Sequence, residues 1–246
     1  MFPTIRGFTS LQRTPQTDLQ LGSVLAFVAG AANAGGFLAV GQYTSHMTGM
    51  VSSVADHLVL GNLTLAMAGL GAVLAFLLGA MTTAWLVNWG MRHQLRSAYG
   101  LPLIVEAAAL LVFGLFGAAI GFMTPVFLPL TVVLLCFIMG LQNAVITKIS
   151  RSVIRTTHVT GLITDLGIEL GKLLYVNRQS GAAPVLANRS RLRVHGQLIA
   201  CFFMGGLAGA LGFKHLGFIS TVPLAALLLM LVMRPALDDW QRLRAA

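Results

Sequence analysis

Two short motifs of the form His-X-Thr-Gly contain the residues of this chain best suited to chemistry. Each motif combines an imidazole, a hydroxyl and a glycine, and the six residues are His46, Thr48 and Gly49, and His158, Thr160 and Gly161. Histidine titrates near neutral pH and can donate a hydrogen bond or carry a proton. Glycine lets the backbone turn or approach a neighbour closely. The motifs therefore predict binding of a small polar ligand or ion. The simpler alternative is that each histidine makes a structural hydrogen bond between helices.

The composition is that of an integral membrane protein. Of 246 residues, 57% are hydrophobic and 9% are charged, whereas about 25% are charged in a soluble domain. The net charge is +9, but the basic residues flank apolar runs, which the positive-inside rule explains without a nucleic-acid partner. Cys136 and Cys201 lie in separate apolar stretches. They lack metal-ligand spacing, so we expect no metal, cofactor or disulfide.

Hydropathy predicts about six transmembrane helices, each needing about 20 apolar residues to cross a bilayer. The predicted spans are 21–40, 63–89, 101–122, 126–146, 194–213 and 216–233. With the N-terminus inside, every Lys and Arg except Lys214 falls on the cytoplasmic side, which is a strong orientation signal. Both tails, 1–20 and 235–246, are therefore predicted to be cytoplasmic.

An internal repeat relates the two halves of the chain. Asn143 follows Asn33 by 110 residues, and each of them comes three residues after a glycine. His158 follows His46 by 112 residues, and both begin a His-X-Thr-Gly motif. Two matches in the same order at nearly the same offset indicate that the halves share one structural plan.

Three spans in each half, 21–122 and 123–234, make the repeat inverted, because an odd number reverses the orientation of the second half. We therefore predict an all-α membrane protein of two inverted three-helix repeats. Each repeat carries a re-entrant or broken-helix motif segment, at 43–60 and 158–175. If both segments crossed completely, the eight-span alternative would lose most of the charge bias. Many secondary transporters share the inverted plan.

The polar residues around the motifs have expected roles and simpler alternatives. Neighbouring Ser or Thr hydroxyls are expected to cap a short helix, whose positive end favours an anion or the carboxylate of a zwitterion. Asp56 and Asp165 are expected to serve ion or proton coupling, because carboxylates within a membrane are costly. Asp56 could instead be an ordinary surface charge. Asn33 and Asn143 either line the site or hold the central helices together.

Two further carboxylates have expected partners. Glu169 and Lys172 are three residues apart and are predicted to form an ion pair on one helix. Glu106 lies near the start of its span, where it could snorkel, pair with Arg96 or have a functional role.

The stretches GAANAGGFLAVGQYTSHMTGM and MGLQNAVITKISRSVIRTTHVTGLITDLG resemble the YoaK-type family of bacterial inner-membrane proteins. The resemblance covers nearly the whole chain apart from the N-terminal tail. It implies six helices and a bacterial inner membrane, but no substrate, because the family is functionally uncharacterised. Met50 follows the first motif where the family is expected to have Asn, so a ligand contact from that position is in doubt.

The favoured function is secondary transport of a small molecule or ion, preferably anionic or zwitterionic, at a site between the inverted halves. A passive channel is the closest alternative, since such repeats can also frame a pore. A membrane-embedded enzyme is less favoured because GxSxG and HExxH motifs are missing. A structural role is the remaining alternative. The lipid bilayer and the unknown substrate are the expected partners, and an oligomer is left open.

Overall fold

The computed structural model describes residues 14–120, 123–151, 154–178 and 183–245, and this part of the chain contains helices and no strands. The helices are α1 (Pro15–Val40), α2 (Met47–Val59), α3 (Leu63–Arg92), α4 (Leu101–Ala119), α5 (Thr124–Ile149), α6 (Val159–Leu174), α7 (Arg189–Leu216), the 3-10 helix η2 (Gly217–Ser220) and α8 (Thr221–Ala245). The all-α prediction is confirmed for these residues. Residues 1–13 of the predicted N-terminal tail and 121–122 of the third predicted span lie outside them.

Five described stretches are long and apolar enough to cross a bilayer, so the chain is a multi-pass integral membrane protein. Four of them belong to α1, α3, α4 and α5, and the fifth, Arg189–Arg242, contains 54 residues. At 1.5 Å per residue the fifth stretch would be about 81 Å long as one helix, far longer than a bilayer core of about 30 Å. The backbone divides it at Gly217, where φ is +64°.

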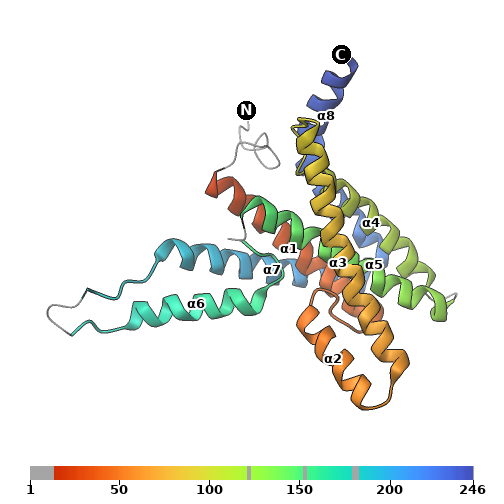
Figure 1. Ribbon diagram of the computed structural model, residues 1–246, viewed down its shortest axis with the longest axis horizontal. Helices are drawn as coiled ribbons and strands as arrows, with labels where there is room; N and C mark the ends of the chain where they lie inside the picture. Colours follow the sequence, from red (N-terminus) through yellow and green to blue (C-terminus); the bar gives the residue numbers. More distant parts are fainter. Residues whose placement is uncertain (1–13, 121–122, 152–153, 179–182, 246) are drawn as a thin grey trace.

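The short helices α2 and α6 are not among these candidates. They contain 13 and 16 residues, which corresponds to about 20 and 24 Å of helix. Figure 1 shows α2 beside the beginning of α3 and α6 beside the beginning of α7, in two hairpins that project in different directions. Each motif segment is therefore a short helix packed alongside a long one.

The helices α1 and α7 cross in close backbone contact (Figure 1). Gly30 of α1 lies against the carbonyl oxygen of Phe202, and Gly205 of α7 lies against the carbonyl oxygen of Phe27. Neither glycine has room for a Cβ atom. Small residues at such positions let membrane helices approach closely, and van der Waals contact then holds them together.

The helices α3 and α5 cross in the same way. Gly79 of α3 lies against the carbonyl oxygen of Phe137, and Gly140 of α5 lies against that of Phe76. Both crossings therefore join two Phe-X-X-Gly sequences, in which the glycine of one helix meets the phenylalanine carbonyl of the other. The hydroxyl of Thr83 adds a hydrogen bond of 2.9 Å to the carbonyl oxygen of Leu141.

The remaining long helices, α4 and α8, pack against each other, and α4 also packs against α5. The α8 helix continues to Ala245, so the described part of the predicted tail 235–246 is helical. The α1 helix begins at Pro15, before the predicted span, because Thr14 and Thr17 form a reciprocal capping box at its N-terminus.

Candidate functional site

Each His-X-Thr-Gly motif is anchored by the asparagine of the long helix that precedes it. The Asn33 Oδ1 atom accepts hydrogen bonds from the Ser45 hydroxyl at 3.1 Å and from its backbone N–H at 3.4 Å. The Asn143 Oδ1 atom accepts one from the Thr157 hydroxyl at 2.7 Å. In both halves the donor directly precedes the histidine. The asparagines thus position the beginnings of α2 and α6.

The histidine side chains fold over their own glycines. His46 and His158 occupy the N-cap positions of α2 and α6, and neither helix has a side-chain cap. The prediction that Ser45, Thr48, Thr157 or Thr160 caps these helices is therefore wrong. The hydroxyls of Ser45 and Thr157 donate to asparagine side chains instead. Each imidazole occupies the space where a Cβ atom of Gly49 or Gly161 would stand. The absence of a Cβ atom at these two glycines leaves room for the imidazoles to approach the backbone closely.

The other predicted site residues lie on the surfaces of the two short helices. The exposed side chains are His46, Thr48 and Asp56 in the first half and His158, Thr160 and Asp165 in the second. Within the described residues, no hydrogen bond or ion pair joins the first set to the second. One site shared by both motifs therefore stays a prediction.

A cavity of about 530 Å³ lies where the beginnings of α1 and α7 meet the end of α5 and the helix α6. Its polar lining residues are Asp18, Ser150, Asp165, Ser190, Arg191 and His195. Of the residues predicted from sequence, Asp165 lines this cavity. The mixture of carboxylate, guanidinium and imidazole groups suits a small ligand that carries both signs of charge.

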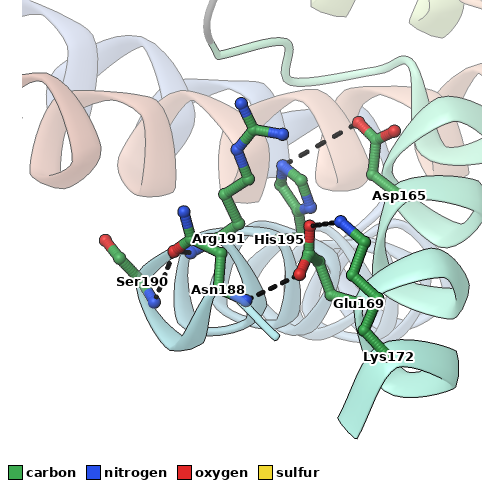
Figure 2. Close-up of polar contacts among 7 residues, drawn as sticks. All are labelled: Asp165, Glu169, Lys172, Asn188, Ser190, Arg191 and His195. Carbon is green, nitrogen blue, oxygen red and sulfur yellow. Dashed lines mark hydrogen bonds and ion pairs between the residues drawn. The ribbon is translucent and has the colours of Figure 1, made fainter. Parts of the chain in front are cut away.

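His195 and Asp165 both line this cavity, and their side chains point toward each other (Figure 2). The His195 Nε2 atom is 4.0 Å from the Asp165 Oδ2 atom, which makes an ion pair when the imidazole is protonated. His195 is buried, and its Nδ1 atom has no hydrogen-bond partner among the described residues. Sequence reasoning missed His195 because it counted as a neutral residue of the span 194–213. The sequence signal that could have found it is a histidine that closely follows several arginines at the start of an apolar run.

Glu169 fastens α6 to the beginning of α7 (Figure 2). Its Oε1 atom accepts a hydrogen bond of 2.9 Å from Lys172 Nζ, which confirms the predicted pair, and its Oε2 atom accepts one of 2.7 Å from the Asn188 N–H. The Asn188 N–H and then Lys172 lower the pKa of the Glu169 carboxyl, because both stabilise its charged form.

We expect Glu169→Gln to loosen α6 from α7 and to weaken the dependence of stability on acidic pH. Since folding lowers the pKa of Glu169, its stabilisation is present above the ordinary glutamate pKa of about 4.3. This stabilisation is lost as the pH falls through the lowered pKa. Thermal unfolding of the purified protein at neutral and acidic pH measures the difference.

The control for this prediction is Asp56→Asn, because Asp56 is exposed on α2. The control should keep the acid sensitivity of the unmodified protein. Equal acid sensitivity in Glu169→Gln and in the unmodified protein would show that this carboxylate does not hold the hairpin.

Glu106 has a different environment from the one expected. Arg96 pairs instead with Asp238, at 3.3 Å between Nη1 and Oδ2, so the proposed pairing of Arg96 with Glu106 is wrong. Glu106 is fully buried on α4, and neither of its carboxyl oxygens has a hydrogen-bond partner among the described residues. Among all the described residues, no group of three or more His, Cys, Asp or Glu side chains could hold a metal ion.

Comparison with known proteins identifies one family model, described as protein of unknown function (DUF1275), which matches residues 21–234. The matched region includes both motifs and all five candidate membrane spans except the first residues of α1 and the last of α8. No curated protein and no solved structure matches the chain.

Proposed function

We propose that the chain, which belongs to the DUF1275 family, is a secondary transporter of an anionic or zwitterionic small molecule or ion. Its site would lie between two inverted halves. The observation that carries the proposal is the repetition of one set of contacts in the two halves. The narrower YoaK-type assignment, six crossings, a bacterial inner membrane and cytoplasmic termini are parts of the same proposal.

The repeated contacts relate α1 to α5 and α3 to α7. Phe-X-X-Gly sequences meet at both crossings, and in each half an asparagine anchors the residue before the motif histidine. Each half also orders its helices as long, short, long, long. Because α2 and α6 are shorter than a bilayer core of about 30 Å, each half contributes three crossings. An odd number supports inverted halves, the plan used for alternating access.

The cavity beside α6 supports a ligand of mixed charge. With the basic residues inside, the beginnings of α1 and α7 lie on the cytoplasmic side, so the cavity would be an entrance from the cytoplasm. Asp165 and His195 face each other there, and Arg191 lines the same wall. A carboxylate ligand could displace Asp165 as the partner of His195 while its amino group meets Asp165.

The inverted arrangement is tested by single-cysteine labelling in a variant lacking Cys136 and Cys201. We expect Asn62→Cys, in the turn between α2 and α3, to react with an impermeant maleimide from outside the cell. We expect Asn177→Cys, after α6, to react only when the cytoplasmic face is opened. Reaction of both positions from the same side would contradict the inverted halves.

The transport function is tested with purified protein in proteoliposomes. Thermal-shift screening against inorganic anions and amino acids should find a stabilising ligand, and His46→Ala and His158→Ala should each reduce the response. Saturable uptake with counterflow is expected of a carrier, whereas flux that does not saturate would identify a passive channel. A ligand response untouched by both histidine changes would remove the motifs from the site.

A further inference from the structure

Three carboxylates are buried in the described part of the chain, and only one of them lacks partners. Glu169 accepts hydrogen bonds from Lys172 and from the backbone of Asn188. Asp239 accepts three hydrogen bonds from the turn that precedes α4. Neither oxygen of Glu106 accepts any, although its side chain is completely buried. Its charge is therefore the one that the described residues leave uncompensated.

The position of Glu106 on α4 places it among apolar side chains. Leu103, Leu110 and Phe113 are three residues before, four after and seven after it, so they share its face of the helix. All three are fully buried. Glu106 comes five residues after Leu101, the first residue of α4, which puts it about 8 Å along the helix axis. This depth lies within the span.

The elements packed against α4 supply no counter-charge. They are α3, α5, α8 and η2, and their ionisable groups are Arg92 on α3, Cys136 and Lys148 on α5, and Arg234, Asp238, Asp239 and the two arginines of the last turn on α8, with none on η2. Lys148 donates instead to Asn88 at 2.9 Å. None of these groups makes a hydrogen bond or ion pair with Glu106.

An ionised carboxylate is costly in such surroundings, whereas the neutral acid is far less so. A hard metal cation bound to Glu106 instead of a proton would need about six oxygen ligands. The described residues include no group of side chains around Glu106 that could hold a metal ion. We propose that Glu106 binds a proton and is a coupling-proton site of the transport cycle, in addition to the coupling role expected of Asp56 and Asp165. The inference rests on the proposed transport function. The proton is held in the carboxylic acid form of Glu106. It passes to water, as hydronium, when water reaches α4 during the transport cycle.

Infrared spectroscopy of the protein in lipid nanodiscs tests this protonation without a substrate. The chain has only seven Asp and Glu residues, so a protonated-carboxyl band at neutral pH is readily assigned. We expect one such band, shifted by carbon-13 glutamate, which among the carboxyl side chains labels only Glu106 and Glu169. The band should disappear in Glu106→Gln and persist in Asp56→Asn. Its absence at neutral pH, or its persistence in Glu106→Gln, overturns the proposal.

Exchange into heavy water separates a coupling site from a sealed structural acid. The band of a coupling site should shift within the time of a transport turnover, because the proton must reach water. A band that stays unshifted for hours overturns the coupling role. If Glu106→Gln does not fold, the isotope label assigns the band to a glutamate, and persistence of the band in Glu169→Gln assigns it to Glu106. If the substrate screen finds no ligand, the proposed transport function fails. The infrared measurement still tests the protonation of Glu106, because it needs no substrate.

Once a substrate is known, its uptake provides the second readout. Glu106→Gln should abolish the acceleration of uptake by a pH gradient but retain counterflow, which needs no net proton movement. Acceleration by the gradient in this variant equal to that of the unmodified protein overturns the coupling role, and acceleration by a sodium gradient alone does the same.

Discussion

Substituting Gly140 by alanine is expected to lower the free energy of unfolding by about 3 kcal/mol, at the upper end of the usual cost of overpacking. A Cβ atom at this position meets the backbone carbonyl of Phe76 on α3, not a flexible side chain. Since the backbone cannot step aside alone, α3 and α5 must separate along the crossing. Reversible unfolding in mixed detergent micelles measures the loss.

The matched control for this prediction is Gly71→Ala, on the same pair of helices. A Cβ atom at Gly71 meets no atom within 4 Å, so alanine there should be neutral or stabilising by up to about 1 kcal/mol through helix propensity. Gly196→Ala offers the same control on α7. If Gly140→Ala were as stable as these controls, the close contact between α3 and α5 would be disproved.

Replacing Asp239 by alanine is expected to be comparably damaging, at about 3 kcal/mol or more, because it leaves two buried donors and one partly buried donor without an acceptor, at about 1–3 kcal/mol for each buried donor. Asp239 Oδ1 accepts from the Arg96 N–H at 2.9 Å. Its Oδ2 accepts from the Ser97 N–H at 2.8 Å and the Ser97 hydroxyl at 2.7 Å. These bonds tie the end of α8 to the turn between α3 and α4. The same unfolding measurement applies.

The neighbouring residue provides the control for this second prediction. Asp238 pairs with Arg96 at 3.3 Å, but both side chains are about half exposed, and such surface pairs contribute about 0–1 kcal/mol. Asp238→Ala should therefore have little effect. Equal losses in the two variants would indicate that general charge, and not the bonds to the turn, stabilises this end of the molecule.

The sequence by itself determined the membrane class, the positions of most apolar helices and the pairing of Glu169 with Lys172. Hydropathy and spacing along one helix are local properties, so they can be read without knowing which helices meet. The repeat of Asn33 and His46 at Asn143 and His158 was also visible in this way. Its physical meaning was not, because the asparagine partners lie on other segments.

Only the tertiary structure decided which polar groups meet. Packing of α6 against α7 brings Asp165 to His195, and the end of α8 takes Asp238 to Arg96 and leaves Glu106 unpaired. Contacts between residues far apart in the chain depend on how whole helices cross, and the crossings depend on the absence of a Cβ atom at a few glycines. The two motifs could thus be found in the sequence. Helix packing decided that they lie in two separate hairpins, α2 with α3 and α6 with α7, and that the carboxyl of Glu106 is buried without a partner.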